Sequence, residues 1–168
     1  MPDLAPFHGL IVFAHIIGVF LFLLAHGVSA GVILKIRDER DPAALRTLLE
    51  LSRQSLNVAF LGFLIWFFGG ILAGFSGNFW TSGRYWIWAS LGIAVLVVIV
   101  MTPLGRMYMD RIREALGIEA KTGAIDAGAT VDSAAIEAAI SSGRPLLLAS
   151  IGLAAVVTLA YLMMFKPF

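Results

Sequence analysis

Four long apolar segments constrain this fold more than any other feature of the sequence. Residues 7–34, 56–76, 86–104 and 145–165 contain no Asp, Glu, Lys or Arg. Each segment reaches the roughly 20 residues that a helix needs to cross about 30 Å of hydrocarbon. Only 14% of all residues are charged, against about 25% in an average soluble domain. The sequence therefore predicts an all-α polytopic membrane protein, a four-transmembrane-helix bundle that forms a single domain over residues 1–168.

The basic residues predict how the chain is oriented in the membrane. Of the 12 Lys and Arg residues, all but Arg84 and Lys166 fall between the first and second spans or between the third and fourth. Cytoplasmic loops carry an excess of these residues, so we expect two cytoplasmic loops and both termini outside. The expected location is a bacterial inner membrane. Residues 1–6 lack a basic n-region and the first apolar segment is too long for an h-region, so we expect a membrane helix there rather than a cleavable signal peptide.

The first connection predicts a helix start. Asp41 followed by Pro42 is typical of an N-cap with proline at the first helical position. The amphipathic segment 43–55 is expected to continue directly into the second span. Anchoring of this segment on the membrane surface is the alternative.

The second connection, 106–144, is the longest soluble piece. We expect it to continue the third span as a helix, to loosen over 121–130, and to form a short helix over 132–142 with Asp132 as its N-cap. Pro103 is expected to close or kink the third span.

The three histidines of the chain, His8, His15 and His26, all lie on the first span. At 100° per residue, His8 and His15 differ by about 20°, and the step to His26 nearly restores the direction. The three rings therefore share one face, with separations of about 10 Å and about 16 Å along the helix. Ionisable residues within a membrane are costly to bury without a partner, so they indicate a functional site by default. With both termini outside, His15 falls in the outer leaflet and His26 in the inner one.

One histidine in each leaflet suits a path for electrons through two b-type haems, which bundles hold between helices on His or Met ligands. Two histidines of one straight helix, about 10 Å or more apart, cannot bind the same iron. The second axial ligand would come from another subunit, from a methionine such as Met101 at the depth of His26, or be absent. Met163 and Met164 end the fourth span near the depth of His8. A homodimer that pairs His15 with its symmetry mate is a further arrangement.

Each candidate also has a structural interpretation. His8 is expected as an interfacial residue, and His26 as a hydrogen-bond partner of Ser29 or of a carbonyl on a neighbouring helix. The methionines serve as core filler in most proteins. Histidine must carry any buried redox or metal chemistry, because the chain has no cysteine and no charged residue within the spans.

Small residues recur at helical spacing, which lets backbones approach closely in lipid. The pairs are Ala14 with Gly18, Gly27 with Gly31, and Gly70 with Gly74. We expect these pairs to be packing sites. Gly18 has a second interpretation, because a flat macrocycle against a helix needs a missing side chain close to its ligand.

His15, the run GVFLFLLAHGVSAG at 18–31, the basic loop after it and the closing YLMMFKP resemble a family of four-span bacterial integral membrane proteins of unknown function. That family is distantly similar to copper-resistance-D-type and protoporphyrinogen-oxidase-like membrane proteins, which also place a histidine on the first span. The resemblance implies a four-helix membrane bundle and favours haem or copper at His15. The oxidase-like relatives are also associated with a membrane lysine, which no span here contains, so that activity is not carried over.

Three functions remain open on these observations. The first is a haem b protein for electron transfer, alone as a dimer or within a larger redox complex, with His15 and His26 as ligands and Gly18 leaving room for the ring. The second is a non-catalytic accessory subunit of a membrane complex. The third is copper handling, with His8 and the outer methionines meeting the ion before His15. We expect an electron carrier or accessory subunit rather than an independent enzyme, contact with the lipid bilayer, a homo-oligomer or other membrane subunits as partners, and no nucleic acid.

Overall fold

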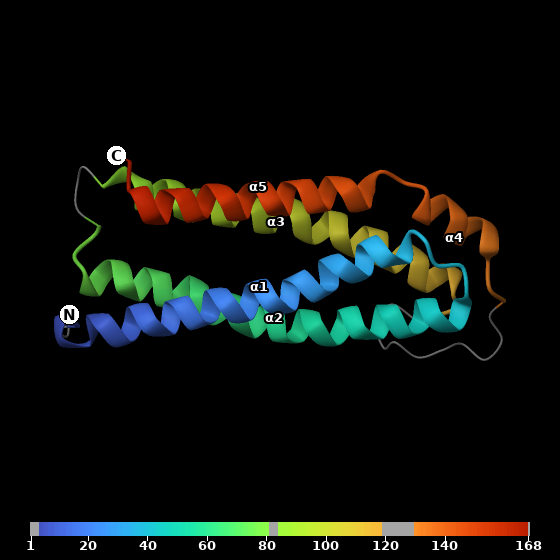
Figure 1. Ribbon diagram of the computed structural model, residues 1–168, viewed down its shortest axis with the longest axis horizontal. Helices are drawn as coiled ribbons and strands as arrows, with labels where there is room; N and C mark the ends of the chain where they lie inside the picture. The colour runs from blue at the N-terminus through green and yellow to red at the C-terminus, as the bar shows by residue number, and fades with distance from the viewer. Residues whose placement is uncertain (1–3, 81–83, 119–129, 168) are drawn as a thin grey trace.

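The computed structural model describes residues 4–80, 84–118 and 130–167, and these residues are mainly helical. A short 3-10 helix, Ala5–Phe7, leads into α1. The helices are α1 (His8–Ile36), α2 (Pro42–Ser76), α3 (Tyr85–Ala115), α4 (Ser133–Ile140) and α5 (Arg144–Phe165). The all-α prediction is confirmed. Figure 1 shows the four long helices running side by side, with both termini at the same end of the molecule.

The four long helices are long and apolar enough to cross a membrane. In the most apolar 18 residues of α1 only 6% are buried inside the protein, and in the other three helices 17–22% are. Side chains such as Leu10, Phe60 and Ile99 are more than three-fifths exposed. In water such a surface would aggregate, so these helices contact a lipid bilayer.

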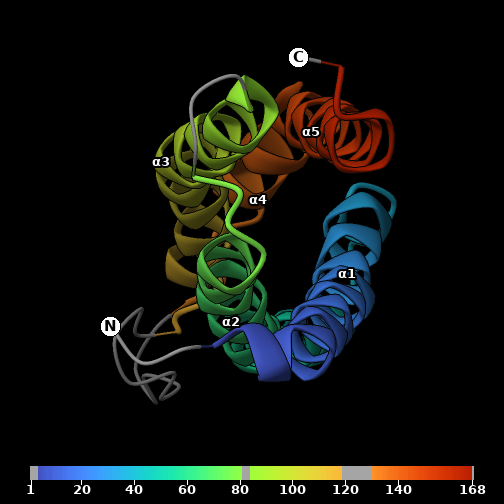
Figure 2. The same ribbon diagram turned by 90° about the vertical axis from the view of Figure 1, so that its left-hand side faces the viewer.

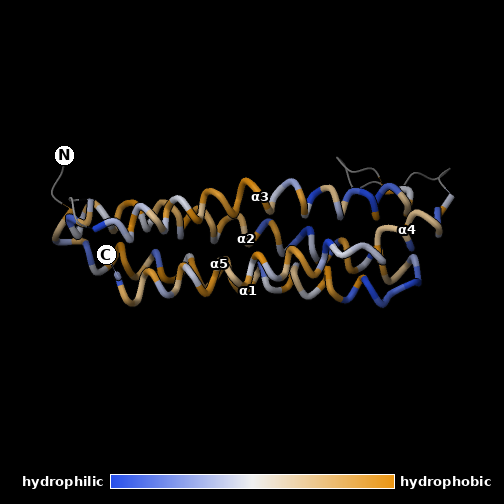
Figure 3. The backbone as a smooth tube through the Cα atoms, turned by 90° about the horizontal axis from the view of Figure 1, so that it is seen from above, coloured by the Kyte–Doolittle hydropathy of each residue, from blue (hydrophilic) through white to orange (hydrophobic). Residues whose placement is uncertain are grey.

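The helices form two antiparallel pairs. α1 packs most extensively against α2, whereas α3 packs against α5 and carries α4 at its end. Figure 2 shows the order α1, α2, α3, α5 around the molecule, and α1 also contacts α5. The helices extend beyond what hydrocarbon requires: α2 has 35 residues, about 52 Å of helix against about 30 Å of hydrocarbon. Figure 3 places the hydrophilic excess of that length at the end opposite the termini. We call this the basic end, because it contains Lys35, Arg46 and Arg53. It is the end where α1 finishes and α2 begins.

The main hydrophobic core also lies at the basic end, outside the most apolar part of the spans. Tyr108, Ile36, Leu45 and Ile112 are fully buried in it. The core draws on all of α1, α2, α3 and α4, with Ile136 and neighbouring residues of α4 closing it. Several core residues lie outside the charge-free segments that hydrocarbon would cover, where apolar burial stabilises a protein as it does in water, whereas lipid provides no such force between the spans.

The segments that connect the spans follow most of the predictions made from the sequence. α2 runs without a break from Pro42 to Ser76, so segment 43–55 extends the second span as a helix. Pro103 lies inside α3, which continues to Ala115 rather than closing at the proline. Asp132 caps α4 through the amide of Ala135. The predicted loosening over 121–130 falls almost wholly outside the described residues.

In the turn between α1 and α2, backbone amides donate hydrogen bonds to two carboxylates, those of Glu39 and Asp41. The amides of Asp41 and Arg40 donate to Glu39 Oε1 at 3.0 and 2.9 Å, which lowers the pKa of Glu39 below its usual value. Asp41 accepts in turn from the amides of Ala43 and Ala44 and forms the predicted N-cap.

Asp41→Ala is expected to lower the free energy of unfolding by about 1 kcal/mol, because two amides in the first turn of α2 lose their acceptor. Thermal unfolding in detergent micelles measures this loss. Asp41→Asn should keep most of the stability, since asparagine caps nearly as well. Equal stability of the alanine and wild-type proteins would contradict the role of the cap.

Candidate functional site

Two of the three histidines, His8 and His15, contact α2 through their rings. His15 donates from Nδ1 to the backbone carbonyl of Trp66 at 2.8 Å, and His8 Nδ1 lies 2.8 Å from Ser76 Oγ. A carbonyl oxygen can only accept, so the proton of the neutral His15 ring resides on Nδ1. Nε2 then keeps its lone pair and has no hydrogen-bond partner among the described residues. This is the arrangement that metal-ligating histidines adopt, with the other ring nitrogen donating to a carbonyl.

Two adjacent glycines of α2 make room for His15. A Cβ placed on Gly69 would lie 3.2 Å from His15 Cβ, and one on Gly70 would lie 3.0 Å from His15 Cε1. The sequence indicated Gly70 only as half of a small-residue pair and did not indicate Gly69. Two adjacent glycines on the second span, at the depth of a histidine on the first, are the sequence pattern that could have indicated both residues.

Gly18 faces the backbone of α2. A Cβ on Gly18 would lie 2.8 Å from the carbonyl carbon of Ile65, and one on Gly62 would lie 2.9 Å from Phe22 Cα. The space left by the missing side chain of Gly18 is therefore filled by α2 and leaves no room there for a porphyrin. Gly18 serves helix packing, and we drop it from the proposed site. Gly27 and Gly31 were expected to be packing sites too, but a Cβ on either would meet nothing within 4 Å.

His26 stacks on Phe22, with ring centroids 5.2 Å apart and an interplanar angle of 10°. Phe22 stacks in turn on Trp66 at 5.5 Å. This aromatic row connects His26 to the residue whose carbonyl holds His15. No hydrogen bond of His26 is found within the described residues. The expected bond to Ser29 is absent, because Ser29 Oγ bonds Ser52 Oγ at 2.8 Å instead.

His8 belongs to the end of the molecule where the termini lie. Its ring meets Phe79 edge-on at 5.9 Å. The Lys166 ammonium and the Arg84 guanidinium also lie over the Phe79 ring, 5.6 and 5.1 Å from its centroid. Aromatic rings with polar partners are typical of a membrane interface, which fits the interfacial interpretation of His8.

The candidate methionines lie apart from the histidines. The Met101 methyl group would lie 3.5 Å from a Cβ on Gly152, so this side chain packs on α5 in the second helix pair. His26 packs within the first pair. Met164 is 75% exposed, and Met163 is partly exposed. In the part of the chain that the structure describes, no group of three or more His, Cys, Asp or Glu side chains could hold a metal ion.

Comparison with known protein families, characterised proteins and solved structures finds no match. The resemblance to copper-resistance-D-type and oxidase-like proteins therefore stays a prediction. What the structure supports is a multi-pass membrane protein with four long apolar helices, in which His8 and His15 of α1 contact α2.

Proposed function

We propose that this chain is a haem b-binding membrane protein that transfers electrons across the bilayer, with His15 as an axial ligand. The observation that carries the proposal is the hydrogen bond from His15 Nδ1 to the Trp66 carbonyl, which leaves Nε2 as a free electron-pair donor within the span. Gly69 and Gly70 give the ring its position. A bound b-type haem would supply one-electron redox chemistry at this depth.

His26 is the proposed ligand at the second level. Its ring is held by stacking on Phe22 and has no hydrogen-bond partner in the described residues. Each haem would also need a second ligand from another residue. Met101 belongs to the other helix pair, so it would need that pair to approach. A second copy of the chain in a homodimer, contributing its own histidine, needs no such change and is our preferred source.

We also propose an orientation. Both termini lie at one end and most of the basic residues at the other. The positive-inside rule then places the basic end in the cytoplasm and the termini on the periplasmic side of a bacterial inner membrane.

His15→Ala is expected to abolish or strongly reduce a Soret absorption band of protein purified from haem-replete cells, because the axial ligand is lost. His26→Ala should reduce the band as well. His8→Ala is the matched control, since His8 is bonded to Ser76 near the interface, and it should keep the full band. A colourless, stable wild-type preparation from such cells would reject the haem proposal.

A non-catalytic accessory subunit is the second candidate. It is favoured by the small buried fraction of the spans and by the structural bonds of His8 and His15 to α2. It predicts co-purification with a fixed set of membrane subunits in mild detergent, whereas a monodisperse free oligomer would count against it. Copper handling ranks third, and growth in copper followed by metal analysis of the purified protein tests it.

A further inference from the structure

A groove with three arginines opens at the basic end. It has a volume of about 510 Å³ and lies between the start of α2 and the end of α3. Arg46, Glu50, Arg53 and Arg113 line it, together with apolar side chains such as Ile118. Three guanidinium groups and one carboxylate line the groove, and Asp110 pairs with Arg113 from outside the lining, so one positive charge remains in excess.

The arginines of this groove differ in their partners. Arg53 forms a two-point ion pair with Glu50, at 2.8 and 2.9 Å, and Arg113 pairs with Asp110 at 2.8 Å. Arg46 has no carboxylate partner within the described residues. Its Nη2 donates to the Leu116 carbonyl at 3.0 Å, while its Nε is buried and has no hydrogen-bond partner among the described residues. A buried charged donor without an acceptor is costly, and an additional anion is one way to satisfy it.

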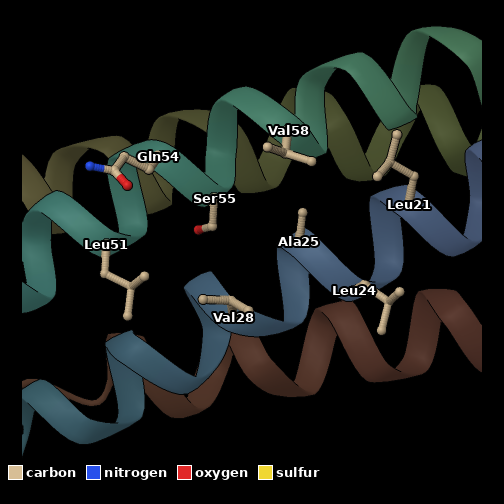
Figure 4. Close-up of a pocket in the computed structure, with 8 residues that line it drawn as sticks. All are labelled: Leu21, Leu24, Ala25, Val28, Leu51, Gln54, Ser55 and Val58. Atoms are coloured by element: carbon tan, nitrogen blue, oxygen red, sulfur yellow. The ribbon is translucent and has the colours of Figure 1, made fainter.

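An apolar groove of about 380 Å³ begins beside the first and runs toward the apolar segments of α1 and α2. Figure 4 shows it between α1 and α2, with Ala25 and Val28 on one wall and Ser55 and Val58 on the other. Leu51 and Gln54 line both grooves, so the two meet along α2. From Arg46 to Val58 the helix rises about 18 Å, and the apolar segment 56–76 begins at the Val58 end of this stretch.

We propose that the two grooves together bind one anionic phospholipid. Its phosphate lies in the arginine-lined groove, where Arg46 supplies the unpaired Nε–H, and one acyl chain follows the apolar groove between α1 and α2. The phosphate supplies the acceptor and the negative charge that the lining lacks. The order of the grooves, charged at the membrane surface and apolar toward the bilayer centre, matches the order of the two parts of a lipid.

Binding is tested on the purified full chain in detergent with phosphatidylglycerol and phosphatidylcholine, read by native mass spectrometry and by the shift in Tm. Phosphatidylglycerol should bind more tightly than phosphatidylcholine. Arg46→Gln should weaken phosphatidylglycerol binding about tenfold, because a charge-assisted bond to the phosphate is lost. Arg111→Gln is the matched control and should bind normally, since Arg111 is exposed on α3 and bonds to no described side chain.

A second pair of variants tests the apolar groove. Val58→Trp should weaken binding of long-chain phosphatidylglycerol but leave the dihexanoyl form unaffected, since only a long chain reaches Val58. Leu61→Trp, on an exposed part of α2 outside the groove, is its control. Equal binding of the two lipids by wild type, or unchanged binding by Arg46→Gln, would overturn the proposal. Inorganic phosphate that reproduces the whole Tm shift would identify a site for free phosphate and also overturn it.

Discussion

Gly18→Leu is expected to separate α1 from α2 and to lower the free energy of unfolding by about 3 kcal/mol or more. The reason is the distance between the two backbones. Even a Cβ on Gly18 would lie 2.8 Å from the carbonyl carbon of Ile65, and backbone atoms cannot move aside as a side-chain end can. Leucine adds three further carbon atoms in the same direction. Unfolding in mixed micelles measures the loss.

The chain supplies a matched control for this substitution. Gly27 lies on the same helix, yet a Cβ there would meet nothing within 4 Å. Gly27→Leu should therefore leave the stability unchanged or raise it by up to about 1 kcal/mol, because leucine favours helix more than glycine does. If both variants lose the same stability, the loss comes from the helix itself and not from the α1–α2 contact.

Tyr108→Ala is expected to cost about 3–5 kcal/mol, the usual effect of removing a large buried aromatic side chain. Tyr108 is 0% exposed and lies among Ile36, Leu45 and Ile112 at the basic end. The cavity would open in the part of the protein that joins the two helix pairs. Thermal unfolding in detergent micelles measures the consequence.

Tyr108→Phe separates the ring from its hydroxyl group. The hydroxyl oxygen is buried and has no hydrogen-bond partner in the part of the chain that the structure describes, so its removal should leave the stability equal or higher. A clear loss of stability in the phenylalanine variant would mean that the hydroxyl has a partner, and the alanine result would then no longer report packing alone.

The features that could be predicted from the sequence are those with a local cause. The four spans follow from long runs without charge. The caps at Asp41 and Asp132 follow from a short side chain that accepts from the next amides, and both are confirmed. The common face of the histidines follows from helical periodicity. It agrees with the contacts of His8 and His15 with α2.

The features that could not be predicted depend on which helix lies opposite. The spacing of small residues indicated Gly18 and Gly27 equally, but only Gly18 meets α2. Ser29 could have paired with His26 on its own helix, yet Ser52 of α2 lies closer in space and takes the bond. The hydrophobic core at the basic end was missed because its members are scattered over four segments, each with only a few apolar residues among charges.

That core sets an order for biogenesis. α1 packs mainly against α2. This helix pair can therefore form as soon as residue 76 has been synthesised and inserted. Tyr108 and Leu45 must wait longer, because Ile136 and Ile140 of α4 cover the same cluster and are synthesised last among its members. A nascent chain paused before residue 133 therefore leaves part of the apolar cluster at the basic end uncovered.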